Sequence, residues 1–193
     1  MTGPLGPEEI TYERAKELAR SDDASVRRAL AEREDLSPEL LYYLAEDTSA
    51  DVRLAVASNE RAPRQTDLLL AQDTDADVRG GLAAKIATVA PELNVAESSK
   101  IYAQTHEALA TLARDQITKV RTILSDALKD VVDAPAVIIK MLASDLEIEV
   151  SGPILEFSPV LSESDLIQII EKRAGKRGRC GDFPSLKCFR KPS

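Results

Sequence analysis

Arginines and carboxylates recur along this chain at a fixed spacing. An arginine side chain can bind an external anion, or it can pair with a carboxylate of the protein itself. Five frames each begin with a Leu-Ala pair and place a valine eight residues after the leucine. The frame leucines are Leu18, Leu44, Leu70, Leu112 and Leu142. An arginine follows the valine in the first four frames: Arg27, Arg53, Arg79 and Arg121. The third residue after the leucine is Ser21 in the first frame and an aspartate in the others: Asp47, Asp73, Asp115 and Asp145.

Two interpretations of these arginines compete. They could form a row that grips anions, or a structural ladder in which each bonds turn carboxylates and carbonyls within or between frames. A guanidinium fork matches a carboxylate in two-pronged geometry, and each of the last four frames supplies its own acid. The spacing therefore favours the ladder.

Other chemistry-bearing residues form no catalytic or metal-binding pattern. The run from Asp73 to Asp77 imitates the start of a calcium loop, but Val78 and Ala84 stand where such a loop needs glycine and glutamate. His106 is the single histidine, and the two cysteines, Cys180 and Cys188, lack the spacing of a zinc site. No phosphate-binding loop, nucleophile elbow or HExxH motif occurs. The sequence predicts no catalytic residue, no metal and no cofactor, and hence no enzyme.

The elements that must position the frames are predicted to be paired helices. In the second frame, Ser37 and Pro38 can start one helix, and the turn after Asp47 can start another. Apolar residues recur at helical spacing in both segments. The fold class expected is all-α, a right-handed α–α superhelix of about five helical hairpins. Between the third and fourth frames the offset grows from 26 to 42 residues, which predicts a helix through Ile86 and Val89, a break at Pro91 and a helix over about 97–112.

Composition is consistent with one helical domain in a chain of 193 residues. We expect a leader over 1–11, a helical domain over 12–170 that ends with a helix over about 165–170, and a tail over 171–193. The leader lacks the features of a signal peptide, and no apolar run approaches the length of a membrane span. These features predict a cytoplasmic protein that does not contact a membrane.

Charge divides the chain in two. The tail holds eight basic and two acidic residues, which leaves 17 basic and 31 acidic residues, a net charge of −14, in the first 170. An acidic body repels nucleic acid, so binding of nucleic acid by the helical domain is disfavoured. The tail is predicted to be disordered or non-native: a basic peptide, the end of a truncated array and a shifted reading frame all fit it.

The frame Leu-Ala-x-Asp…Val-Arg resembles HEAT repeats, and more narrowly the short leucine-rich-repeat-variant type. Residues 149–167 are similar to the signature of a bacterial family of uncharacterised HEAT-like proteins, a domain of unknown function. The resemblance covers about residues 12–170 and implies a helical solenoid without implying any catalytic residue. The chain departs from the leucine-rich-repeat-variant pattern because no cysteine precedes Cys180, so the iron–sulphur cysteines of that type are missing.

In stacked helical hairpins, the second helices usually line the concave face, and positions two and six after each frame valine should point outward. These positions are Arg28, Glu32, Leu54, Ser58, Gly80, Ala84, Thr122, Asp126, Gly152 and Glu156. We expect this face to bind a partner protein or peptide through Leu54, so that the protein acts as a non-catalytic scaffold.

The alternative is a nucleic-acid function, either through the basic tail or as an enzyme like the HEAT-like glycosylases that repair alkylated DNA. Such enzymes need a basic concave face and aromatic side chains, whereas this chain has an acidic body and no tryptophan. A further expectation concerns four apolar residues of the last helix, which could form an exposed strip that another copy covers. They are Leu166, Ile167, Ile169 and Ile170.

Overall fold

The computed structural model describes residues 10–88 and 100–177, and within these ranges every regular element is an α-helix. The first six helices are α1 (Tyr12–Leu18), α2 (Ala24–Ala31), α3 (Pro38–Leu44), α4 (Ala50–Ser58), α5 (Gln65–Ala71) and α6 (Ala76–Thr88). The other five are α7 (Lys100–Leu112), α8 (Thr118–Leu128), α9 (Ala136–Ala143), α10 (Ile148–Phe157) and α11 (Glu163–Arg177). The all-α prediction is confirmed at the level of fold class.

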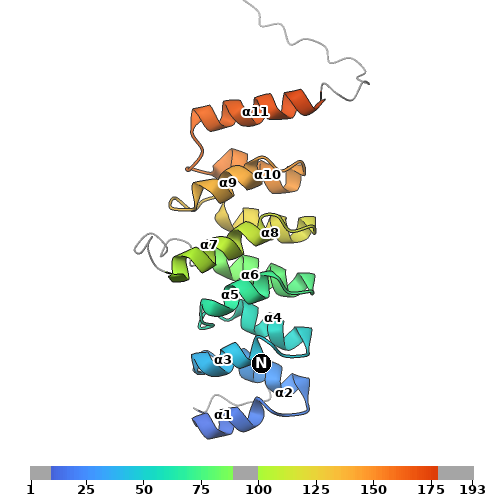
Figure 1. Ribbon diagram of the computed structural model, residues 1–193, viewed down its shortest axis with the longest axis vertical. Helices are drawn as coiled ribbons and strands as arrows, with labels where there is room; N and C mark the ends of the chain where they lie inside the picture. The colour runs from blue at the N-terminus through green and yellow to red at the C-terminus, as the bar shows by residue number, and fades with distance from the viewer. Residues whose placement is uncertain (1–9, 89–99, 178–193) are drawn as a thin grey trace, which may run out of the picture. The chain divides into compact units, whose positions relative to one another are not determined.

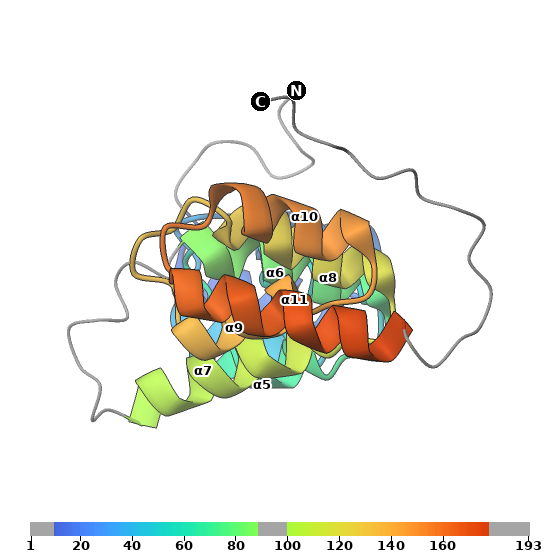
Figure 2. The same cartoon turned by 90° about the horizontal axis from the view of Figure 1, so that it is seen from above.

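Each frame supplies two consecutive helices that pack on each other, from α1 with α2 to α9 with α10 (Figure 1). The second helix of each frame also packs on the next one, so α2, α4, α6, α8 and α10 contact one another in order. Figure 2 shows α5, α7 and α9 on one side of these pairs and α6, α8 and α10 on the other. The frames therefore contact each other chiefly through their second helices.

Burial of the frame residues explains why the pairs form. The frame leucines from Leu44 onward are fully buried, and the frame valines from Val52 onward are at most 1% exposed. In the first frame, Leu18 and Val26 are only half-buried. Removing apolar side chains from water contributes about 25 cal/mol per Å², so from the second frame onward one leucine and one valine per frame anchor each helix pair to its neighbours.

The chain divides into two compact units after residue 161, and the second unit begins with α11. Ser162 and Asp165 cap α11 reciprocally, because each backbone N–H donates to the side chain of the other residue, at 3.2 and 3.3 Å. That helix continues to Arg177, so the prediction that order ends near Ile170 is wrong for residues 171–177. Lysine and arginine are good helix formers and suit the negative end of a helix dipole.

The apolar strip predicted on α11 is partly exposed. Ile167 and Ile170 are 52% and 66% exposed, whereas Leu166 is half-buried and Ile169 is buried. Self-association through this strip stays a prediction. Several predictions fall on residues that the structure does not describe. They are the helix end at Val89, the break at Pro91, the helix start at residue 97, and most of the leader and the tail, including both cysteines.

Candidate functional site

The turn edge is the surface formed by the turns between the two helices of each frame: residues 21–23, 47–49, 73–75, 115–117 and 145–147. In the last four turns, the aspartate carboxylate accepts a hydrogen bond from the backbone N–H two residues later, at 2.8 or 2.9 Å. An aspartate that bonds its own backbone in this way holds a turn and starts the following helix. The turn edge is therefore built on ordered backbone.

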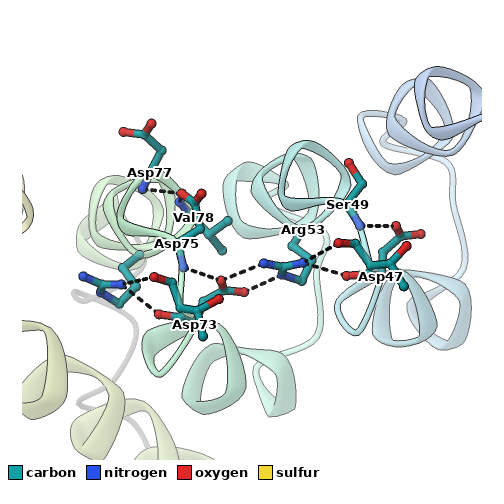
Figure 3. A network of polar contacts seen from close by, with 10 residues as sticks. Asp47, Ser49, Arg53, Asp73, Asp75, Asp77 and Val78 are labelled. Atoms are coloured by element: carbon teal, nitrogen blue, oxygen red, sulfur yellow. Dashed lines mark hydrogen bonds and ion pairs between the residues drawn. The ribbon is translucent and has the colours of Figure 1, made fainter.

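At each junction between neighbouring frames, one arginine side chain bonds the turns of both frames. Arg53 donates from Nε and Nη2 to the two carboxylate oxygens of Asp73, at 2.6 and 2.9 Å (Figure 3). Its Nη1 donates to the backbone carbonyl of Asp47, at 2.8 Å. The carbonyl belongs to the turn of its own frame, and the carboxylate belongs to the next frame. Arg53 thus joins two turns with a single side chain.

The same arrangement occurs at the other three frame arginines. Arg27 bonds Asp47 and the Ser21 carbonyl, Arg79 bonds Asp115 and the Asp73 carbonyl, and Arg121 bonds Asp145 and the Asp115 carbonyl. The arginine side chains are only 12–16% exposed, and the aspartates 6–13%. Because carboxylates and carbonyls already take up the guanidinium forks, these arginines have no open fork to offer an anion.

The ladder has four rungs in the described residues, and serines stand at both ends. Ser21 takes the aspartate position of the first frame, and its hydroxyl accepts a bond from the Asp23 N–H. Ser151 takes the arginine position of the fifth frame, where its hydroxyl donates to the Glu147 carbonyl at 3.1 Å. Ser21 therefore needs no arginine partner, and Ser151 needs no carboxylate partner.

The ladder lowers the pKa of two of its acids, Asp47 and Asp73. The hydrogen bond from Arg27 lowers the pKa of Asp47, and this effect outweighs partial burial, which acts in the opposite direction. Burial alone would raise the pKa of Asp73, but the bonds from Arg53 and from the Asp75 N–H leave it below its usual value. The same pairings raise the pKa of Arg27 and Arg53.

These shifts predict how stability depends on pH. A carboxyl whose pKa is lower in the folded state stabilises the fold above its unfolded pKa, which is about 3.9. That contribution is lost as the pH falls through the lower, folded pKa of Asp47 and Asp73. We expect the free energy of unfolding to fall steeply below about pH 4, as measured by urea denaturation at several pH values. Asp47→Asn should be less stable at pH 7 and lose less on acidification; an equal loss in both proteins would contradict the role of Asp47.

The second helices place the predicted outward row mostly at the surface. Arg28, Glu32, Ser58, Ala84, Asp126 and Glu156 are exposed, and Leu54, Thr122 and Gly152 are half-buried. Gly80 is buried, and its contact with a partner stays a prediction. A Cβ atom at Gly80 would lie 3.2 Å from Ile123 Cδ1, because α8 packs against this side of α6.

Four residues of the row meet at one pocket between α2 and α4. This pocket, called the groove below, encloses about 340 Å³ and is lined by Arg28, Glu32, Asp51, Leu54, Ala55 and Ser58. Arg28 Nε donates to Glu32 Oε1 at 2.8 Å on its α2 side. On α6, Gly81 has no side chain, and a Cβ there would come within 2.7 Å of Leu54 Cδ1 and 2.9 Å of Ser58 Oγ. The position of Leu54 in the groove thus depends on Gly81.

A buried ion pair lies in the interior of the third frame, and the sequence reasoning missed it. Lys85 Nζ on α6 lies 2.8 Å from Asp67 Oδ1 on α5, and their side chains are 3% and 0% exposed. The other oxygen, Asp67 Oδ2, accepts no hydrogen bond among the described residues and lies 4.0 Å from Arg64 Nη1. The sequence did hold a clue to this buried pair, because Asp67 stands three residues before its frame leucine, where the other four frames have an apolar residue. Those residues are Ala15, Leu41, Leu109 and Ile139.

In the described part of the chain, no group of three or more histidine, cysteine, aspartate or glutamate side chains could hold a metal ion. None of the helices described is both long and apolar enough to cross a membrane. The chain matches no protein-family model and no curated protein sequence.

Proposed function

We propose that this protein is a non-catalytic interaction module, a HEAT-like right-handed solenoid that binds a partner protein or peptide in the groove. Support for the solenoid comes from the packing of each second helix on the next and from the repeated arginine ladder. The observation that carries the binding proposal is the pocket itself, in which four of the predicted outward residues converge on one surface.

The chemistry of the groove suits a peptide that presents one apolar side chain. Leu54 and Ala55 give it an apolar floor, while Asp51 and the paired Arg28 and Glu32 form a charged rim. An apolar centre with a polar rim is the usual composition of a protein-binding surface. The acidic charge of the body opposes nucleic acid as the ligand.

Capture from a cell lysate tests the proposal, with the full-length protein and two variants as baits. Leu54→Glu places a charge in the groove, and Arg28→Glu reverses the rim. The Arg28–Glu32 pair is about half exposed, so its loss costs little stability. Proteins retained by the wild type and lost with both variants would support the groove as the binding site. Identical captures from all three baits, or no capture at all, would reject it.

Gly81→Ala tests the groove without any change of charge. The new methyl group must displace the ends of Leu54 and Ser58, so binding in the groove should weaken by about tenfold or more. Stability should change by less than about 1 kcal/mol, because the higher helix propensity of alanine offsets the contact.

Gly80→Ala is the matched control for that variant, because its methyl group meets Ile123 on α8 and not the groove. The measurement is the dissociation constant for the captured partner, together with thermal unfolding of each protein. Equal affinities for Gly81→Ala and Gly80→Ala would contradict the assignment of the groove.

A further inference from the structure

The turns of the fourth and fifth frames expose large apolar side chains where earlier turns are polar or small. Ile117, Leu146 and Ile148 are 44%, 73% and 68% exposed. The equivalent residues of the second and third frames are Thr48, Ser49, Ala50, Thr74, Asp75 and Ala76. The change from polar to apolar is therefore confined to two neighbouring turns.

These turns are held together by the last rung of the ladder. Arg121 Nη1 donates to the Asp115 carbonyl at 2.6 Å, and its Nε donates to the Asp145 carboxylate at 2.7 Å. Each aspartate also fixes its own turn, through the N–H groups of Ile117 and Glu147. The three apolar side chains are thus presented on a backbone that is already ordered, which lowers the entropy lost on binding.

Folding does not explain these side chains, because an exposed leucine or isoleucine gains little from burial. The second and third frames make the same turn and the same arginine rung with threonine, serine, aspartate or alanine at these positions. Neighbouring exposed apolar side chains on a folded protein mark an interaction surface.

Charge indicates the chemistry of the partner. Glu147 and Glu149 alternate with the apolar residues, and both are exposed. Their carboxylates form no ion pair or hydrogen bond among the described residues. The nearby Lys119 is paired with Asp77 at 2.9 Å. The surface therefore carries unpaired negative charge beside its apolar groups.

We propose that Ile117, Leu146, Glu147, Ile148 and Glu149, here called the turn surface, bind a basic amphipathic segment of a partner protein. Leucine-type side chains of that segment pack on Ile117, Leu146 and Ile148, and its lysines or arginines face the two glutamates. The turn surface lies on the turn edge and the first two residues of α10, and it shares no residue with the groove, so the proposal does not depend on the proposed function.

The test uses the full-length protein and two synthetic amphipathic helical peptides, one of leucine and lysine and one of leucine and glutamate. The double variant Leu146→Thr, Ile148→Ala copies the third frame, so its fold and stability should be unchanged. We expect only the lysine peptide to bind the wild type, and the double variant to bind it at least about tenfold more weakly. Leu69→Thr removes an apolar side chain that is 40% exposed on α5 and should bind like the wild type.

Three results would overturn the proposal. The lysine peptide could bind the double variant as tightly as the wild type, or the glutamate peptide could bind equally well. Alternatively, Gly81→Ala could abolish peptide binding while the double variant leaves it intact. That third result would assign the peptide to the groove, so the two proposals fail independently.

Discussion

Replacing Asp67 with leucine is expected to lower the free energy of unfolding by about 3–5 kcal/mol, although leucine is the residue found at this position in two other frames. The variant leaves the ammonium group of Lys85 in the interior, where its side chain is 3% exposed, without the carboxylate 2.8 Å away. A buried charge that has lost its counter-ion costs far more than the removed hydrogen bond. Urea denaturation at neutral pH, followed by circular dichroism, measures the change.

Adding Lys85→Met to this variant shows whether the instability comes from the lost charge pair or from a poor fit of the leucine side chain. In the double variant Asp67→Leu, Lys85→Met, no charge of the pair remains, and apolar side chains of similar volume fill the space. Replacement of a buried ion pair in this way is often neutral or stabilising. We expect the double variant to recover most of the lost stability. A double variant as unstable as Asp67→Leu alone would show that packing, not the loss of the Asp67 carboxylate beside Lys85, causes the effect.

Arg53→Met is the second change with a large expected effect, also about 3–5 kcal/mol. It leaves the Asp73 carboxylate, 7% exposed, without its two-pronged partner and the Asp47 carbonyl without the Nη1 donor. Arg53→Lys should restore only part of the loss, because one ammonium cannot reproduce the planar fork that reaches both acceptors. Thermal and urea unfolding of the three proteins measure these differences.

Arg28→Met is the matched control for that experiment. It removes the same side-chain type from a neighbouring helix, but its pair with Glu32 is 56% and 51% exposed. Exposed pairs four residues apart on a helix contribute only about 0.3–0.5 kcal/mol. If Arg28→Met and Arg53→Met destabilised the protein equally, the ladder would have no special part in stability.

The periodicity of the sequence predicted the features that depend on a single helix. The frame leucines and valines identified the helices and part of the core, because from Leu44 onward each of these side chains faces inward at a fixed offset along its own helix. Spacing alone could not tell which aspartate each arginine bonds, since that depends on how the next frame packs. The Asp47 carboxylate, for example, bonds Arg27 of the preceding frame, while its carbonyl bonds Arg53 of its own.

The features that sequence reasoning missed arise where separate helices meet. Gly80 is buried because Ile123, 43 residues later in the chain, packs against it. Asp67 and Lys85 stand 18 residues apart on two helices, and only the packing of α5 on α6 brings their charges together. The groove was anticipated as a row of outward positions, but the placement of Leu54 and Ser58 in it depends on the missing side chain of Gly81.

The central claim, that the groove is the binding site, is tested most directly by amide hydrogen exchange of the full-length protein with and without the partner it captures. Exchange measures local opening of the backbone, and a bound partner slows it where contact is made. We expect new protection in α2 around Arg28 and Glu32 and in α4 around Leu54 and Ser58, and none of this protection in Gly81→Ala. Protection that spared α2 and α4, or that persisted unchanged in Gly81→Ala, would contradict the account.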